Sequence, residues 1–292
     1  MLLADVYMTL KKYPEAEAEL KKLAPMGYDL LSDYAAVYAL SNKNSKESIL
    51  EVQYQQGNTG LNSNFIYNFI PIGQNKPITG VDYNNRILGG WNMPTQAMID
   101  SYEPDDKRLN ASIGIAEGTG TTGSFTIETV KDPAGYTAPV GKSGKPFIRK
   151  YLHAHTQPAN TDDNFPVYRF ADALLLLAEA LNEQGKSGEA LPFLNQVRTR
   201  AGLAASAETN QAALRAIIAH ERKIELAFEN KRWFDLVRTG KAVEVMTADG
   251  QYLKSIYPYL LPGSYNVTEN RLIYPIPLRE TLIGSLTQNP GY

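Results

Sequence analysis

Two adjacent carboxylates are the first side chains in this sequence that could do catalytic chemistry, Asp105 and Asp106 in "EPDDKR". A glycoside hydrolase needs two carboxyl groups that face each other across a cleft, whereas neighbouring side chains in a turn diverge. We therefore expect the pair to cap or solvate this turn. The chain also lacks a G-x-S-x-G motif, a Walker loop and a dinucleotide fingerprint. These observations predict a protein that is not an enzyme and uses no cofactor.

A pair of histidines could bind a metal ion. His153 and His155 in "HAHT" are two positions apart, so on a strand their rings would share a face and offer two nitrogen ligands. Asp162 and Asp163 are the nearby acids that could complete the set. We expect that they do not, and we assign no metal ligand in this chain.

The segment "AHERKIELAFENKRWFDLVRTGK" interleaves charges with large apolar side chains. Its acids and bases balance, which does not favour binding to a polyanion: Glu221, Arg222, Glu225, Arg232, Asp235 and Arg238. Apolar spacing predicts one helix that ends near Asn230 and a second that stops at Gly240. We expect the two helices to pack through Trp233 and Phe234, with ion pairs fixing their angle.

The composition is that of a folded globular chain. Of the 292 residues, 43% are hydrophobic and 21% charged, and the net charge is −2. This balance makes nucleic acid a poor candidate partner. The sequence has no apolar run long enough to predict a membrane span. Cysteine is absent, which excludes disulfides and thiolate chemistry within this chain.

Two helical hairpins of similar sequence stand far apart in the chain. Leu3–Leu23 superposes on Leu177–Val197 without a gap, so that Ala4 falls on Ala178, 174 positions later. Small alanines at fixed places, with larger apolar residues three and four apart, are typical of tetratricopeptide-type hairpins. Such hairpins recur about every 34 residues, so a long insertion must separate these two. The alternative is that any two amphipathic hairpins rich in alanine and leucine align this well.

The insertion is dense in glycine, asparagine, threonine, proline and tyrosine. This composition predicts loops with short strands, for example at Ile49–Tyr54 and Ser124–Val130. Between them, "TQAMIDSYEP" predicts a short helix that Thr95 caps and that ends before Pro104. A loop-rich segment mounted on a helical scaffold is a usual place for binding.

After the insertion the pattern is helical again. "FADALLLLAEALNEQ" is apolar almost all round and predicts a buried helix, in which Arg169, Asp172 and Glu179 need charged partners. We divide a single, mainly α domain into a helical hairpin at 1–40, a loop-rich ligand-binding region at 41–165 and a helical part at 166–292. The helical pattern starts at the second residue, so we expect that the N-terminal part of the domain is missing.

Four stretches carry a family resemblance. "HERKIELAFENKRWFDLVRTGK" resembles the signature near the C-terminus of the SusD/RagB family of bacterial surface nutrient-binding lipoproteins. The other stretches that resemble this family are "WNMPTQAMIDSYEPDDKRL", "FPVYRFADALLLLAEALNEQGKSGEAL" followed by "NQVRTRAGL", and the tail "YPIPLRETLIGSLTQNPGY". Together they cover most of the chain.

The resemblance implies tetratricopeptide-like helical hairpins packed against an irregular, loop-rich region. It also implies a protein that is displayed on the outer membrane, binds a glycan or oligosaccharide and hands it to a SusC-like TonB-dependent transporter. Complete members are longer, and their lipid anchor is missing from this chain. The resemblance leaves open which glycan is bound, or whether the ligand is a peptide.

A glycan site needs exposed rings for stacking on sugar faces and polar side chains for hydrogen bonds to hydroxyls. The richest neighbourhood of this kind is Gln53–Asn92. We expect Trp91 and Tyr83 to be stacking platforms, and we expect these residues to lie beside them: Tyr67, Asn84, Asn85 and Arg86. The alternative for Trp91 is that it plugs a core beneath "GGWNMPT".

Two other functions stay open at this point. A tetratricopeptide-like scaffold that binds a protein or peptide partner would present an apolar groove along its helices, whereas a glycan-binding protein would present exposed rings in the loop region. A glycoside hydrolase is the third reading, and turnover of an oligosaccharide by the purified chain would establish it.

Overall fold

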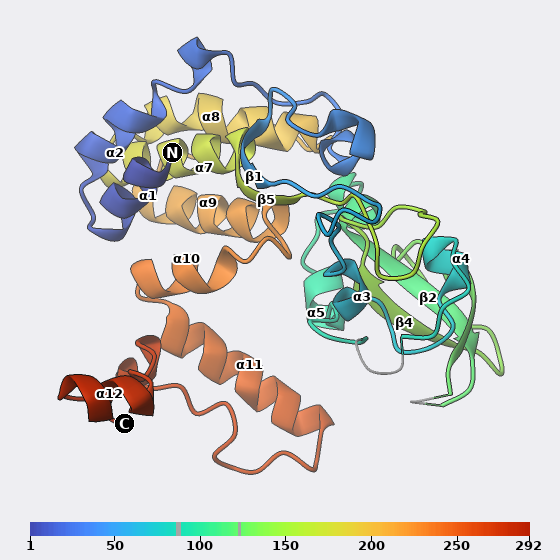
Figure 1. Ribbon diagram of the computed structural model, residues 1–292. Helices are drawn as coiled ribbons and strands as arrows, with labels where there is room; N and C mark the ends of the chain where they lie inside the picture. The colour runs from blue at the N-terminus through green and yellow to red at the C-terminus, as the bar shows by residue number, and fades with distance from the viewer. Residues whose placement is uncertain (86–88, 122–123) are drawn as a thin grey trace. The chain divides into compact units, whose positions relative to one another are not determined.

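The computed structural model describes residues 1–85, 89–121 and 124–292, which form two compact units, Met1–Glu229 and Asn230–Tyr292 (Figure 1). The first unit has the helices α1 (Leu2–Thr9), α2 (Tyr13–Leu20), α3 (Ile66–Phe69), α4 (Lys76–Thr79), α5 (Gln96–Ile99), α6 (Arg108–Ser112), α7 (Phe170–Glu183), α8 (Ser187–Arg200) and α9 (Gln211–Glu225). Its strands are β1 (Ser48–Val52), β2 (Ile113–Thr119), β3 (Thr126–Lys131), β4 (Ser143–Ile148) and β5 (Phe165–Arg169). The second unit has α10 (Arg232–Arg238), α11 (Ala242–Ile256) and α12 (Leu278–Gly284).

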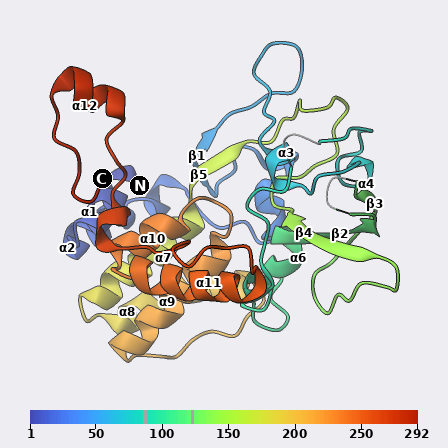
Figure 2. The ribbon, with the colours of Figure 1, turned by 90° about the horizontal axis from the view of Figure 1, so that it is seen from below.

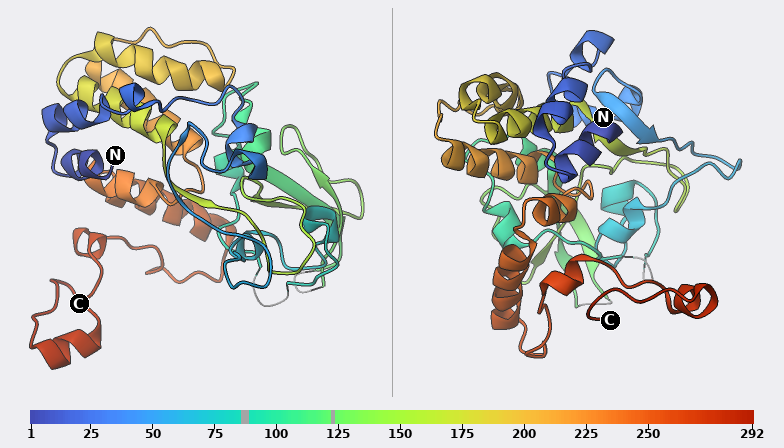
Figure 3. Two further views of the ribbon diagram at one scale, coloured as in Figure 1. Left: turned by 45° about the horizontal axis from the view of Figure 1, so that its top comes forward. Right: turned by 90° about the vertical axis from the view of Figure 1, so that its left-hand side faces the viewer.

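Two helical hairpins that are distant in sequence pack against each other in the first unit. The hairpin of α1 and α2 lies beside α7, which forms the other hairpin with α8 (Figures 1 and 3). The aligned positions are buried in one shared core: Ala4 and Ala178, Ala16 and Ala190, Leu20 and Leu194, Leu23 and Val197. Because alanine ends at Cβ, helices can approach closely where these residues face a neighbour. The predicted pair of tetratricopeptide-like hairpins, separated by an insertion, is confirmed.

Helix α7 is the centre of the helical core. Every residue from Phe170 to Asn182 is buried, as the apolar sequence predicted. Its neighbours are α2, α8 and α9. Pro14 lies in the first turn of α2, where its missing N–H costs no helical hydrogen bond. The predicted cap of α5 is confirmed, because Thr95 Oγ1 accepts a hydrogen bond from the Met98 amide at 3.2 Å.

The two ends of the insertion pair with each other. Strands β1 and β5 are antiparallel, with Ser48 opposite Arg169 and Val52 opposite Phe165, and Figure 2 shows them side by side. We call this pair of strands the neck. The insertion therefore leaves the helical core and returns to it at one place. The strand predicted at Ile49–Tyr54 is confirmed as β1, which begins one residue earlier and ends two residues earlier.

Inside the insertion, β2 lies between β3 and β4 in an antiparallel sheet. Ile127 and Phe147 from this sheet, with Phe125 just before β3, share a hydrophobic core with Ile66 and Ile70 of the α3 region. The strand predicted at Ser124–Val130 is confirmed as β3, whereas the sequence analysis missed β2 and β4. This core supports the loops that carry the candidate ligand-binding residues.

A network of buried charges joins the insertion to the helical core. Its members are Glu47, Asp106, Arg108, Lys150, Arg169, Arg198, Arg200, Glu221, Glu225 and Glu229. Arg198 also pairs with the partly exposed Glu103. Arg169, at the neck, donates from Nη1 to Glu47 at 2.7 Å, from Nη2 to Glu225 at 3.0 Å and from Nε to Glu229 at 2.8 Å. Its prediction as part of a paired network is confirmed, as is that of Asp172, which pairs with Arg222 at 2.9 Å.

The arginines decide the charge of the buried acids. Burial raises the pKa of Glu225, but Arg200, Arg169 and Arg108 outweigh it and hold that pKa well below its usual range. Burial opposes ionisation of Glu229 too, yet Arg169 and Lys150 lower its pKa to about 2. These carboxylates stay ionised, and bases balance their charge. They therefore organise the fold and are poor proton donors or acceptors.

Glu221 and Glu225 of α9 pair with bases of the first unit. Glu221 accepts from Arg108 at 2.5 Å and from Arg198 at 3.0 Å, and Glu225 accepts from Arg200 at 2.6 Å. These arginines come from the insertion and from α8, because α9 is covered by both. These two glutamates of α9 therefore join the insertion to the helical core.

In the second unit, α10 packs against α11, and Asp235 pairs with Arg238 within α10 at 2.7 Å. Asn230 has the left-handed conformation that was predicted for it, with φ of 59°, although α9 has already ended at Glu225. Phe234 is 61% exposed, and its expected packing against α9, which belongs to the first unit, stays a prediction. Among the helices that the structure describes, none is both long and apolar enough to cross a membrane.

Candidate functional site

Asn85 ties together the loops that carry the predicted ligand-binding residues. Its Oδ1 accepts a hydrogen bond from the Gly73 amide at 3.0 Å, and its Nδ2 donates to the carbonyls of Tyr67 at 3.3 Å and Ile70 at 3.4 Å. The side chain is buried. Asn85 is therefore a support for the site, and its burial does not favour the predicted direct contact with a ligand.

The backbone before Trp91 is held tightly against α3 and the residues that follow it. The amide of Gly90 donates to the Ile70 carbonyl at 2.7 Å, and the amide of Trp91 donates to the Asn68 carbonyl at 2.8 Å. At Gly89 a Cβ atom would lie 2.9 Å from the same Ile70 oxygen, so only glycine fits there. These contacts fix the position of the backbone from which the Trp91 ring projects.

The ring of Trp91 points into solvent, with 63% of the side chain exposed. Gly90 and Asn92 on either side have φ of 78° and 50°, in the left-handed region that lets the chain turn sharply around the tryptophan. The alternative that Trp91 plugs a core is therefore wrong. A large apolar ring held outward on a fixed backbone loses little conformational entropy when a ligand stacks on it.

Tyr83 is partly exposed, and Tyr67 lies beneath it. The two rings meet edge to face, with centroids 5.3 Å apart and planes at 88°. Tyr67 itself is buried, its hydroxyl bonds to His155 Nε2, and burial raises its pKa. Tyr67 therefore orients the Tyr83 ring and offers no face for stacking in this structure.

The structure thus sorts the predicted ligand-binding residues into three groups. Trp91 is exposed, and Tyr83 and Asn84 are partly exposed. Tyr67 and Asn85 are buried supports. Arg86 lies outside the described residues.

The two histidines do not share a strand face, which corrects the expected geometry. His153 lies in an irregular segment and pairs through Nδ1 with Asp163 at 2.5 Å, whereas His155 bonds to Tyr67. In the part of the chain that the structure describes, no group of three or more His, Asp or Glu side chains could hold a metal ion.

Asp105 and Asp106 have different surroundings, so they form no catalytic pair. Asp105 is exposed, with φ of 64°. Asp106 accepts a hydrogen bond from the Arg108 amide at 2.9 Å, as expected of a turn cap. The predicted capping role is therefore confirmed for Asp106, whose carboxylate is also buried against the Arg108 guanidinium at 2.7 Å.

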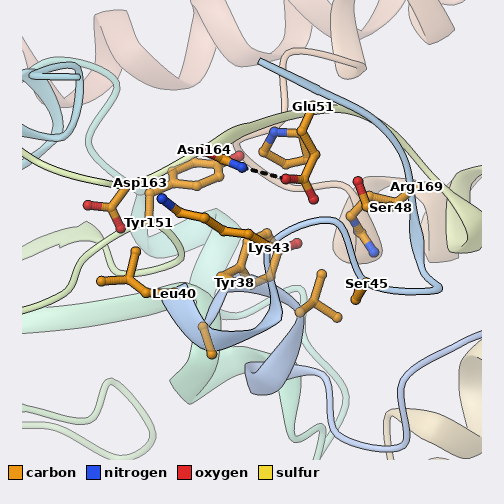
Figure 4. A pocket seen from close by; sticks show the side chains of 13 residues that line it. Tyr38, Leu40, Lys43, Ser45, Ser48, Glu51, Tyr151, Asp163, Asn164 and Arg169 are labelled. Carbon is orange, nitrogen blue, oxygen red and sulfur yellow. Dashed lines mark hydrogen bonds between the residues drawn. The ribbon is translucent and has the colours of Figure 1, made fainter. Parts of the chain in front are cut away.

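A narrow pocket at the neck is too small for a sugar. Figure 4 shows Tyr38, Lys43, Glu51 and Tyr151 around it, with Asn164 donating to Glu51 at 2.7 Å. The volume open to the centre of a water-sized sphere is about 30 Å³, which suits only one or two water molecules. This pocket is a packing gap between the neck and the segment around residues 37–45.

An apolar hollow of about 340 Å³ lies between α2, α7 and α8. Leu20, Phe170, Leu174 and Phe193 are among the residues that line it. A groove of this kind is what the scaffold alternative predicts, so that alternative keeps one observation in its favour.

Comparison with known proteins identifies the relatives of this chain. The model of the SusD family matches residues 46–292. SusD-like protein P2 of Formosa agariphila is 28% identical over 317 residues, which cover 99% of this chain and 58% of P2. The sequence similarity therefore extends through both the helical hairpins and the insertion.

Solved structures show the same fold. A SusD superfamily protein from Parabacteroides distasonis is 26% identical, with a TM-score of 0.71 over 100% of this chain and 62% of that one. A laminarin binding SusD-like protein is 27% identical, with a TM-score of 0.68 over 100% of this chain and 61% of that one. The chain thus spans about three fifths of the length of these relatives.

Proposed function

The chain belongs to the SusD family, and on that premise we propose that it is a non-enzymatic cell-surface protein that captures an oligosaccharide and delivers it to a SusC-like TonB-dependent transporter. The observation that carries the proposal is the exposed ring of Trp91 on a hydrogen-bonded backbone. Tyr83 and Asn84 are partly exposed in the same loop region and would add a second ring and a hydrogen-bonding amide. Arg86 stays a predicted contact.

Stacking suits this geometry better than enclosure does. A sugar ring has a weakly apolar face that covers an exposed indole, while its hydroxyls stay in water or bond to nearby amides. A platform of this kind can bind the middle of a long chain, because it does not require the ends of the chain to fit into a cavity. An oligosaccharide or polysaccharide is therefore the ligand class we propose.

Laminarin is the first ligand to test. The structural neighbour described as a laminarin binding SusD-like protein matches over the whole of this chain. This neighbour supports a β-glucan as the starting point, and the binding test also includes other glycans.

Support for a non-catalytic role comes from the acids. The buried carboxylates at the neck are each held by arginine or lysine, and Asp106 is held by Arg108. Such carboxylates are not placed across an open cleft from each other, as glycoside hydrolysis requires. We propose that the bound sugar leaves the protein unchanged.

Membership of the family supports a proposal for location and partner. We propose that the full-length protein is held at the outer membrane by a lipid anchor. Delivery to the transporter would need release of the ligand, which fits a shallow platform better than a closed pocket.

The test is affinity electrophoresis and calorimetry with laminarin, other neutral glucans and a panel of plant and algal polysaccharides. Trp91→Ala should weaken binding of the preferred glycan by about tenfold or more, equivalent to ~1.4 kcal/mol. Tyr259→Ala is the matched control, because Tyr259 is 77% exposed but lies outside the loop region. A variant of Trp91 that binds as well as the unmodified protein would refute the proposed platform, and released sugar products would refute the non-enzymatic role.

The second candidate is a scaffold that binds a protein or peptide partner in the apolar hollow on the hairpins. Leu174→Gln would place an amide in the wall of that hollow. Loss of a peptide partner with unchanged glycan binding would favour the scaffold, and loss of neither would remove it.

A further inference from the structure

The first unit has a second open hollow. The ionisable side chains in its wall are two lysines, an arginine, a histidine and a tyrosine. It has a volume of about 370 Å³, within the range of small-ligand sites. Its polar wall is formed by Lys107, Asn110, Arg149, Lys150 and His153. We call it the basic pocket. No Asp or Glu side chain is among the described residues that line it.

The acids that pair with these bases leave several donors unused. Arg149 gives Nη1 to Asp132 at 2.7 Å and to the Asn110 carbonyl at 3.2 Å. A guanidinium carries five N–H groups, and Nε and Nη2 of Arg149 have no acceptor within the described ranges. Asp132 is largely exposed, so this ion pair is weak and open to exchange.

His153 is oriented by a buried partner. Its Nδ1 faces Asp163, whose side chain is buried, so the other ring nitrogen, Nε2, is left for a ligand. An imidazole held by a carboxylate in this way presents its second nitrogen in a fixed direction. The ring itself is partly exposed, which gives a ligand access.

Lys107 supplies charge that no acid offsets. Its ammonium group has no hydrogen bond or ion pair with the residues that the structure describes. The stem is placed by packing, because a Cβ atom on Gly202 would lie 3.1 Å from Lys107 Cε. Lys150 adds a buried amine beneath, bonded to Glu229 at 2.6 Å.

This set of groups matches one kind of ligand. Lys107, Arg149 and Asn110 line one space of monosaccharide size, and charge-assisted hydrogen bonds favour an oxyanion over a neutral hydroxyl. The chain as a whole has a net charge of −2, so this is a local feature and not a general affinity for polyanions. We propose that the basic pocket binds the carboxylate or sulfate group of an acidic sugar residue, an inference that rests on the proposed glycan-binding function.

The test compares oligosaccharides of equal length that differ in charge. Calorimetry at low salt would use a neutral glucan, a uronate-containing chain and a sulfated chain. At least one acidic chain should bind fivefold or more tightly than the neutral one, and added salt should remove much of this difference. The two acidic arms distinguish a carboxylate from a sulfate as the preferred group.

Lys107→Gln and Arg149→Gln, separately and together, should abolish that preference without changing binding of the neutral glucan. Lys12→Gln is the matched control, because Lys12 is also exposed but lies on the N-terminal hairpin. Equal binding of acidic and neutral chains would overturn the inference while leaving the proposed function intact. So would an acidic preference that survives in the double variant.

A second measurement tests the basic pocket when no oligosaccharide binds. Glucuronate, a sulfated monosaccharide and glucose are titrated while the ring signals of His153 are followed by NMR, with His153→Gln used to assign them. The acidic sugars should shift these signals and glucose should not. If only the proposed function is wrong, no oligosaccharide binds but the acidic sugars still shift the ring signals. If no acidic sugar shifts them, the proposed binding of acidic groups in the basic pocket is refuted.

Discussion

The Arg169 guanidinium and the Glu225 carboxylate lie 3.0 Å apart, and neither side chain is more than 2% exposed. Arg169 ends the neck, and Glu225 ends α9. Their pairing therefore joins the insertion to the helical core. Desolvation offsets much of the attraction in a buried ion pair, so the pair chiefly specifies which segments meet, whereas loss of one partner is costly.

Arg169→Met should destabilise the first unit by about 3–5 kcal/mol, because Glu47, Glu225 and Glu229 would lose a buried partner. Denaturant unfolding followed by circular dichroism measures the change. Arg215→Met is the control, since Arg215 pairs with Glu183 at the surface and should cost less than about 1 kcal/mol. Equal losses for the two variants would show that the network has no special role.

Acid should unfold the chain over a pH range that the pKa values of the buried glutamates determine. The pKa of Glu229 falls from 4.5 to about 2 because Arg169 and Lys150 outweigh its burial, and that of Glu225 is also lowered, because arginines outweigh its burial. The unfolded state then binds more protons than the folded state between these values, so stability is present above pH 4.5 and is lost as the pH falls toward 2. Glu221 opposes this trend, since burial raises its pKa.

Urea unfolding at neutral pH and at steps down to about pH 3 checks this slope. Glu229→Gln should lower stability at neutral pH and flatten the acid slope, because one buried titrating group is gone. An unchanged slope in that variant would assign acid unfolding to other carboxylates.

The close approach of the hairpins predicts an effect of side-chain size. Ala178→Leu should cost about 1–3 kcal/mol or more, because Ala178 is completely buried where the hairpins pack and the extra atoms have no space. Ala216→Leu on the exposed face of α9 should have little effect. Thermal unfolding of both variants makes the comparison, and tolerance of leucine at Ala178 would argue against tight packing there.

The support beneath Trp91 can be tested with two glycines. Gly89→Ala should destabilise the loop by about 1–3 kcal/mol, because the new Cβ would lie 2.9 Å from the Ile70 oxygen. Gly188→Ala in α8 has no atom within 4 Å and should be neutral or stabilising by about 0.5–1 kcal/mol. Tryptophan fluorescence in a Trp233→Phe background reports whether the surroundings of Trp91 change, and an unaltered spectrum and stability for Gly89→Ala would contradict the close contact.

Much of the fold could be predicted from local pattern. The alanines and leucines repeated at helical spacing identified both hairpins, and Thr95 and the Ile49–Tyr54 strand were recognised from capping and alternation. Strands β2 and β4 were missed because glycine and proline interrupt their apolar alternation in "GIAEGT" and "SGKPFI". The candidate platform at Trp91 was named from residue type alone.

Thus the sequence by itself determined the helical architecture, the place of the insertion and the family, since these follow from periodicity and motifs that neighbouring residues encode. Only the tertiary structure decided that Trp91 faces solvent while Tyr67 and Asn85 are buried beneath the site. It alone brought Arg169 to Glu225 and placed Lys107 with Arg149 around one hollow. The physical reason is that a loop without periodic pattern has no preferred buried face, so exposure and pairing depend on distant segments that fold around it.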